Sequence, residues 1–336
     1  SIREAYCLIC IKKRCVRCRQ SMVKFGHTAA GMQRWRCERC ASTGRQTRGD
    51  TRNRHRRLWF IRWLTNTATL AMIASRMRCS PSTTQRHFRV CWRDEPHPPS
   101  WIVPSRIVVL DGTSLVARQQ VVLIAYGNGD VRQLSWAFTE RETMTSWSAL
   151  LARIPAPRFV VCDGQKGLLK AIRTQWPATL IQRCLIHIVR QSCAWLTRHP
   201  QTMAGQQLLY IMRALPAVRT RHQKRRWLHR FWNWCRKYEL FLATRTRHPI
   251  DARRWWYTHR KLRRVRTLIE RSLPYLFTFV RHPEVPRTSN HVEGGINARL
   301  HELFRAHRGM SVSKKRVLTA YFLLSKLKKK TTRNDY

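Results

Sequence analysis

The chain of 336 residues carries 66 Lys and Arg against 17 Asp and Glu, which gives a formal net charge of +49 and a pI near 11.6. Self-repulsion on this scale destabilises a compact protein unless a polyanion offsets it, so nucleic acid is the expected partner and an ordinary cytosolic enzyme is disfavoured. The basic residues run along the whole chain and the longest apolar runs are only strand-length, which argues against a polybasic membrane anchor and against a membrane span.

The composition favours a multidomain protein of a reducing compartment. At 43% hydrophobic residues, a chain of this length is expected to form two or three domains. The N-terminal stretch lacks the cleavage pattern of a signal peptide. The twelve cysteines come as Cys-x2-Cys pairs near the N-terminus and as scattered single residues, which points to metal binding rather than to a disulfide framework.

Two Cys-x2-Cys pairs predict a zinc ribbon within residues 1–50. The four cysteines are Cys15, Cys18, Cys37 and Cys40. Each pair can hold one edge of a tetrahedral Zn²⁺, and the residues between the pairs suffice for a hairpin. Four unrelated reduced cysteines or two disulfides are the alternative. A third pair, Cys7 and Cys10, has no assigned role.

Residues 51–95 are expected to form a helix-turn-helix. One helical face carries Leu70, Ile73, Ala74 and Met77. Ser80 and Pro81 then read as the N-cap and first residue of a second helix, which extends to about Trp92 and buries Phe88. Its exposed face is expected to place four side chains in a DNA major groove: Thr84, Gln85, Arg86 and Arg89. An ordinary helical hairpin is the alternative.

A proline-rich stretch, "DEPHPPSWIVP", marks a domain boundary, and a different pattern of elements follows it. "RIVVLDGTS" reads as a buried strand that ends in Asp111, and two strands surround the turn at residues 127–130. After a helix, "RFVVCDGQKGL" reads as a strand that ends in Asp163. This order, with acids at the first and fourth strands, matches the ribonuclease H-like fold, an α/β domain with a mixed sheet and flanking helices. Each acid alone could instead be a turn residue or a helix cap.

The Arg- and Trp-rich residues 191–285 are expected to form an all-helical insertion whose tryptophans lie mostly in its core. After it, "TSNHVEGGINARL" places Glu293 on a helical pattern that two glycines interrupt. A capping box from Asn290 would explain the Glu but not the glycines. Three carboxylates brought together can hold two Mg²⁺ or Mn²⁺ ions for phosphodiester chemistry. Glycines beside the ligand would let DNA approach the helix closely.

Four segments together resemble the DDE transposases of bacterial insertion sequences related to the Mutator elements. They are "VVLDGTS", "VVCDGQKGL", "RCLIHIVRQ" and "TSNHVEGGINARL". The resemblance implies that Asp111, Asp163 and Glu293 form the Mg²⁺-binding catalytic triad. It also matches the family's Cys-x2-His pair to Cys184 and His187, whose role stays open between zinc binding and core packing. The implied partner is double-stranded DNA, both terminal repeats and target, bound by a homodimer or larger oligomer in the bacterial cytoplasm, at the nucleoid.

The expected organisation has five parts: a zinc ribbon (1–50), a helix-turn-helix (51–95), a first part of the catalytic domain (101–190), the insertion (191–285) and a second part of the catalytic domain (286–330). The expected function is cleavage of element-end DNA and transfer of its 3′-hydroxyl strand into target DNA. A catalytically inactive, transposase-derived DNA-binding protein is the main alternative. A structure-selective nuclease would not need the N-terminal DNA-reading modules, and a packaging or ribosomal protein would not need the acids at strand ends.

Overall fold

The computed structural model describes residues 15–18, 20–45, 48–116, 119–128, 133–251, 253–289 and 292–327, without the side chains of residues 48–51, 128 and 293. The chain divides into two compact units. One unit contains Pro99–Asn297; the other combines the residues up to Pro98 with those from Ala298 onward. No helix among the described residues is long and apolar enough to cross a membrane.

The N-terminal sheet is a three-stranded antiparallel ribbon of order β1-β2-β3. Its strands are β1 (Met22–His27), β2 (Gln33–Cys37) and β3 (Thr43–Arg45). Its small core consists of Met22 and cysteine side chains, with Trp35 packed against them. So few apolar contacts cannot stabilise a fold of this size alone. The stability of the ribbon therefore depends on its cysteines.

A helical module brings together the two ends of the chain. It contains α2 (Arg48–Leu64), α3 (Leu70–Arg76), α4 (Pro81–Arg89), α14 (Ala298–Ala306) and α15 (Val312–Lys326). Ser80 caps α4 and Pro81 is its first residue, as the sequence predicts. The ring of Phe60 lies 5.3 Å from that of Phe88 and 5.7 Å from that of Tyr321. Residues from Ala298 onward thus complete the N-terminal module, unlike the expected assignment of 286–330 to the catalytic domain.

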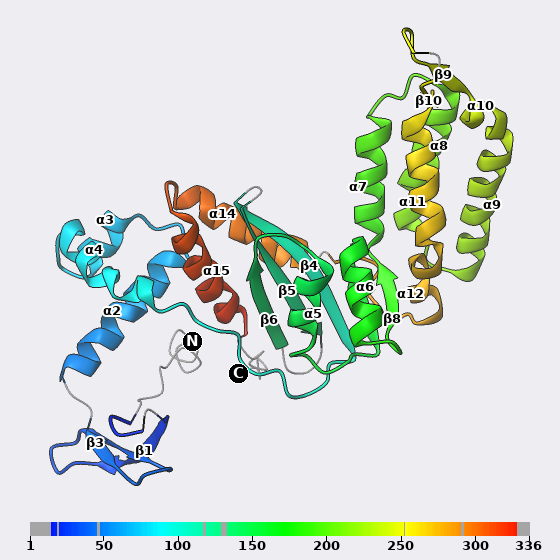
Figure 1. The fold of residues 1–336 in the computed structure, drawn as a ribbon. Coiled ribbons are helices and arrows are strands. Elements are labelled where there is room, and N and C mark those ends of the chain that lie inside the picture. Colours follow the sequence, from blue (N-terminus) through cyan, green and yellow to red (C-terminus); the bar gives the residue numbers. More distant parts are fainter. Residues whose placement is uncertain are drawn as a thin grey trace, which may run out of the picture. The chain divides into compact units, whose positions relative to one another are not determined.

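The central sheet has five strands in the order β6-β5-β4-β7-β8 (Figure 1). They are β4 (Ile107–Val116), β5 (Gln120–Asn128), β6 (Gln133–Thr139), β7 (Phe159–Cys162) and β8 (Leu180–Arg183). The β4-β5-β6 meander is antiparallel, whereas β7 and β8 run parallel to β4. Helices α5 (Met144–Leu151) and α6 (Lys166–Gln175) cover one face and share a core with it. The expected mixed sheet with flanking helices is therefore present.

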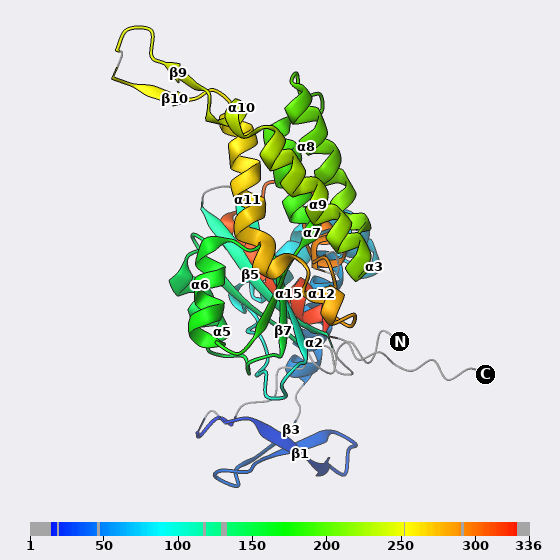
Figure 2. The same cartoon turned by 90° about the vertical axis from the view of Figure 1, so that its right-hand side faces the viewer.

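The insertion rises from the sheet as long helices packed side by side (Figures 1 and 2). They are α7 (Leu185–Leu196), α8 (Met203–Ala214), α9 (Arg221–Lys237) and α11 (Arg260–Leu276), with the short α10 (Glu239–Ala243) and α12 (Thr278–Arg281). The prediction of an all-helical insertion is wrong, because β9 (Arg245–Arg247) and β10 (Trp255–Tyr257) form an antiparallel pair. Trp227 and Trp234 are buried as expected, and their indole N–H groups donate to backbone carbonyls, whereas Trp232 and Trp255 are exposed.

Candidate active site

Asp111 lies on β4, and Asp163 directly follows β7, the strand that pairs with β4 in parallel. The pairing of β4 with β7 joins Val109 to Val161, so two further residues along each chain bring Asp111 opposite Asp163. Neighbouring strands lie about 4.8 Å apart. Asp163 therefore follows the end of its strand as the sequence predicts, whereas Asp111 lies in the middle of β4, which continues to Val116 instead of ending at Asp111.

The backbone around Asp163 is fixed by a buried arginine. Arg183, on β8, donates from Nε and Nη2 to the carbonyl oxygen of Asp163 at 3.1 and 2.8 Å, and from Nη1 to Ser272 at 2.6 Å. Gly164 adopts φ +78°, and a Cβ there would lie 2.0 Å from Arg183 Nε. The amide N–H of Gln165 donates to the Asp163 carboxylate at 2.9 Å. A glycine directly after Asp163 indicates a turn from the sequence alone. The hydrogen bonds of Arg183 to the Asp163 carbonyl can be seen only in the folded structure.

The segment that returns from the insertion contacts Asp111. Residues Glu293–Asn297 form a π-helical turn, and Asn297 Nδ2 donates to Asp111 Oδ2 at 2.7 Å. Glu293 lies four residues before Asn297, which places its backbone about one turn from this contact. Gly294 and Gly295 are exposed, and a Cβ added to either would meet no atom within 4 Å, so the space beside them is open. The predicted capping residue, Asn290, lies outside the described residues.

The Cys-x2-His pair tethers the same segment. Cys184 is fully buried at the start of α7, and its Sγ accepts the backbone N–H of Ser289 at 3.4 Å. The next residue, Leu185, donates its N–H to the carbonyl of Arg287 at 3.0 Å. Burial alone would raise the pKa of the Cys184 thiol, but hydrogen bonds with His187 and Ser289 lower it below its usual value. Cys184 therefore orders the chain that leads to Glu293, and it belongs to no metal-binding group among the described residues.

Glu142 is an acid of this region that sequence reasoning missed. A Cβ on Gly112, the residue after Asp111, would meet the Glu142 carboxylate at 2.5 Å, and the Glu142 carbonyl accepts a hydrogen bond from Gln165 Nε2 at 2.8 Å. Burial, and after it the charge of Asp163, raises the pKa of Glu142. Two features of the sequence were available as signals: a glycine directly follows Asp111, and Glu142 lies in the stretch "TERET".

The residues of the site suit a hard divalent cation. Asp111 and Asp163 offer carboxylate oxygens, which Mg²⁺ prefers. Asn297 Oδ1, beside Asp111, is buried and has no hydrogen-bond partner in the described part of the chain, so it is a further oxygen that a cation would satisfy. The donor set and this unpaired oxygen both fit Mg²⁺.

The four predicted zinc ligands converge. The sulfur of Cys15 lies 3.4 Å from that of Cys40, and the sulfur of Cys18 lies 3.4 Å from that of Cys37. Zn–S bonds of about 2.3 Å would place tetrahedral sulfurs roughly 3.8 Å apart, whereas a disulfide needs about 2.05 Å. Backbone hydrogen bonding from Cys18 is the main cause that lowers the pKa of Cys15 to about 6, which favours the thiolate. These four thiols could hold one zinc ion. The third pair, Cys7 and Cys10, lies outside the described residues.

Three of the four residues expected on a DNA-reading face of α4 are exposed, and Thr84 is not. Gln85, Arg86 and Arg89 are exposed, but Thr84 is fully buried. Thr84 lies one helical turn before Phe88, so both side chains point into the core of the module. The prediction that Thr84 faces the major groove is therefore wrong.

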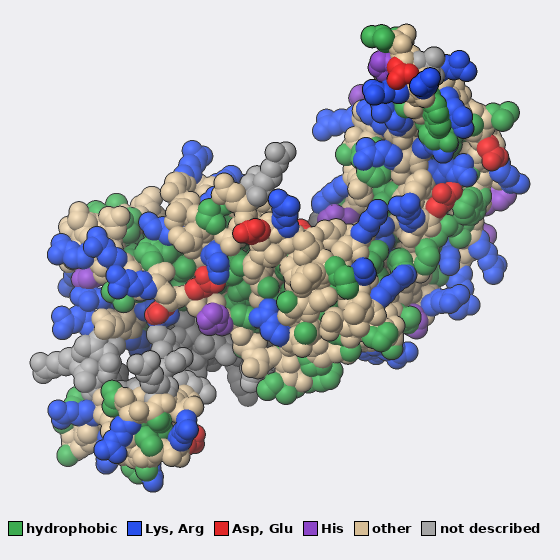
Figure 3. Space-filling view, in the orientation of Figure 1, with side chains coloured by type: hydrophobic (Ala, Val, Ile, Leu, Met, Phe, Trp, Pro, Cys, Tyr) green, Lys and Arg blue, Asp and Glu red, His purple; other side chains and the backbone are tan. Residues whose placement is uncertain are grey.

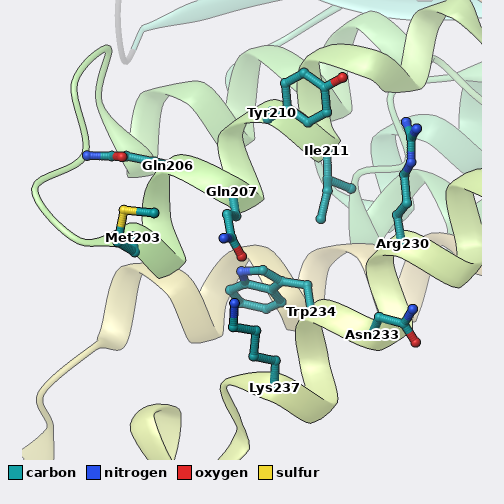
Figure 4. Close-up of a pocket in the computed structure, with 9 residues that line it drawn as sticks. All are labelled: Met203, Gln206, Gln207, Tyr210, Ile211, Arg230, Asn233, Trp234 and Lys237. Carbon is teal, nitrogen blue, oxygen red and sulfur yellow. The ribbon is translucent and has the colours of Figure 1, made fainter.

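A pocket of about 500 Å³ lies on the insertion, and its lining residues are distant in sequence from Asp111 and Asp163 (Figure 4). It is lined by residues of α8 and α9 only, among them Tyr210 and Trp234, and contains no acid. It offers no carboxylate to bind a cation and no residue of the sheet, so the active-site candidate remains the region of Asp111 and Asp163.

Comparison with known proteins identifies a family. Residues 106–272, about half of the chain, match the family described as "Transposase, Mutator family". The chain is 33% identical over 121 residues to the transposase for insertion sequence element IS905 of Lactococcus lactis subsp. lactis (strain IL1403). It is 24% identical over 110 residues to a probable transposase for an insertion sequence element of Corynebacterium diphtheriae.

These alignments are partial. They cover 32% and 31% of this chain, and 31% and 32% of the Lactococcus and Corynebacterium proteins, respectively. Among solved structures, the cryoEM structure of a simian T-cell lymphotropic virus intasome in complex with PP2A regulatory subunit B56 gamma matches at 12% identity and a TM-score of 0.20, over 42% of this chain and 67% of that chain. The family match includes Asp111, Asp163 and the Cys-x2-His pair, and the chain belongs to the Mutator family of insertion-sequence transposases.

Proposed function

We propose that the chain is an active DNA transposase that cleaves the ends of its element and transfers the 3′-hydroxyl strand into target DNA. Asp111, Asp163 and Glu293 are its catalytic residues, carried by a ribonuclease H-like sheet. The observation that carries the proposal is the matched register of Asp111 and Asp163, together with the contact of the Glu293 segment to Asp111 through Asn297.

Asp111, Asp163 and Glu293 would hold Mg²⁺ or Mn²⁺. Bound there, the metal supplies activation of the attacking oxygen and stabilisation of the leaving oxygen of the phosphodiester. The protein's own part is positioning. Arg183 fixes the backbone of Asp163, and Asn297 orients the Asp111 carboxylate. Positioning of this kind raises the reaction rate, because displacing a catalytic group by 1 Å can lower the rate about 100-fold.

The N-terminal modules recognise the double-stranded terminal repeats in this proposal. The exposed Gln85, Arg86 and Arg89 of α4 suit base edges and phosphates of a major groove, and the ribbon is held by zinc. On the face shown in Figure 3, Lys and Arg are scattered and clearly outnumber the acids, which supports DNA as the polyanionic partner. A homodimer or larger oligomer would pair two element ends, at the bacterial nucleoid.

The test is strand cleavage and joining on labelled DNA from the element's own ends, with Mg²⁺ or Mn²⁺. The wild type is compared with Asp111→Asn, Asp163→Asn and Glu293→Gln, and each variant is checked for DNA binding and bound zinc. Loss of both reactions in all three variants, with DNA binding retained, supports the proposal.

Two results would contradict it. A wild type that binds the ends but never cuts them would identify an inactive DNA-binding protein. A fully active Glu293→Gln variant would remove Glu293 from the triad.

A further inference from the structure

A groove opens beside Asp163, between α6 and α11. Its main cavity has a volume of about 850 Å³, and a second cavity of about 420 Å³ continues it along α6. Both cavities share Lys166, Leu169 and Arg271, so they form one path, which we name the α6–α11 groove. In Figure 2, α6 lies beside the sheet-proximal end of α11.

Two rows of cations line this groove. Lys166, Lys170 and Arg173 lie on one face of α6, and Arg260, Arg264 and Arg271 lie on one face of α11. Asp163, at the end of the groove, is the only acid among its lining residues.

The described acid of α11 does not neutralise the cations that line the groove. Its described acid, Glu270, forms an ion pair at 2.8 Å with Arg266, and neither residue lines the groove. Like charges facing one another across a confined space repel, and a polyanion between them would offset that cost. The groove is therefore built for phosphates.

Aromatic rings border the same path. Trp195 and Tyr257 line the main cavity, and Tyr275 lines its continuation. The guanidinium of Arg264 lies 4.7 Å from the ring centroid of Trp195, and that of Arg173 lies 5.3 Å from the ring centroid of Tyr275. A cationic path with aromatic faces is the combination that binds single-stranded nucleic acid, because every base offers a face for stacking. The cavity volume suits a few nucleotides rather than a duplex.

We infer that the α6–α11 groove binds a single strand of DNA next to the phosphodiester at Asp163. The inference rests on the proposed function and names the part of the substrate that the insertion holds. Since α11 and Trp195 belong to the insertion, this assigns the insertion a share of substrate binding beside the carboxylates.

The test is fluorescence anisotropy with a labelled 12-nucleotide oligothymidylate and with a duplex of equal length, at several KCl concentrations without added divalent metal. A groove variant carries Lys170→Gln, Arg264→Gln and Arg271→Gln. A control variant with the same loss of charge carries Arg213→Gln, Arg225→Gln and Arg226→Gln, at exposed positions of α8 and α9 that line neither cavity.

For the oligothymidylate, the groove variant is expected to bind about tenfold or more weakly than the control, with a salt slope lower by about 2, since each lost phosphate contact contributes roughly 0.7. For the duplex, both variants should bind alike. Equal losses for the oligothymidylate in both variants would overturn the inference. So would a duplex loss in the groove variant as large as the single-strand loss.

Trp195→Leu separates stacking from charge. We expect about tenfold weaker binding of the oligothymidylate, within the range for one stacked base, and no change for an abasic oligonucleotide of the same length. Equal effects on both oligonucleotides would reject base stacking at Trp195. Because these assays need no catalysis, single-strand binding without any cleavage in Mg²⁺ would refute the proposed function alone. Cleavage by the wild type, together with equal losses of oligothymidylate binding in the groove and control variants, would refute the groove alone.

Discussion

Gly164→Ala tests whether the turn after β7 holds Asp163 in place. Gly164 adopts φ +78°, a conformation that costs an alanine about 1–2 kcal/mol. A Cβ there would also lie 2.0 Å from Nε of the buried Arg183, in the middle of that side chain. Arg183 would have to give up its two hydrogen bonds to the Asp163 carbonyl, each worth about 1.5–3 kcal/mol because the donor is charged. After partial replacement by water, the total cost is roughly 3–5 kcal/mol.

Gly309→Ala is the matched control. Gly309 has a nearly identical φ of +77°, but nothing lies within 4 Å of the added Cβ, so this variant carries the backbone strain alone. Amide hydrogen exchange reads each region separately. Exchange around β7 and α6 should accelerate roughly 100-fold or more in Gly164→Ala, and exchange around Gly309 by roughly 5- to 30-fold in its variant. Cleavage should fall only in Gly164→Ala. Similar acceleration in both variants would refute the role of Arg183.

Three further outcomes are expected. Cys37→Ser should lose bound zinc and the protease resistance of the ribbon, whereas Cys193→Ser should keep both; zinc retained at full occupancy by Cys37→Ser would exclude this site. Burial lowers the pKa of His307, so the unfolded state binds the proton more readily. The helical module should therefore lose stability as pH falls below about 6.5, and His307→Gln should lose less. The same loss of stability in wild type and variant, measured by urea unfolding from pH 7 to 5, would contradict this. Burial raises the pKa of Glu142, so its charge opposes folding at neutral pH. Glu142→Gln should therefore stabilise the sheet unit at pH 7, and this gain in stability should vanish as pH falls below about 4.3. A variant that is destabilised at pH 7 would refute the raised pKa of Glu142.

The central sheet could be predicted because its signals are local. Continuous apolar runs such as "RIVVL" and "RFVVC" determine buried strands, and an acid directly follows each run, although β4 continues past Asp111 to Val116. The zinc ligands and the cap of α4 follow in the same way from short spacings.

The remaining features depend on contacts between distant residues. Glu142 and Asn297 reach the site through a loop and a π-helical turn, for which no periodic pattern exists. The three-residue strands β9 and β10 are held by pairing with each other and not by their own pattern. Thr84 lies four residues before Phe88, so it shares the buried face of α4 and not the exposed face on which the sequence analysis placed it.

The helical module that joins both chain ends also has a consequence for the order of synthesis. Arg57 donates a hydrogen bond to the hydroxyl of Tyr321, 264 residues later in the chain. During translation, α2 and α4 therefore leave the ribosome long before the helix that covers their core. The sheet and the insertion can fold as soon as their own residues emerge, but the module that contains α4 is complete only after α15 emerges. A message cut short after the codon for Asp163 but before α15 yields a chain with both aspartates and an unfinished helical module.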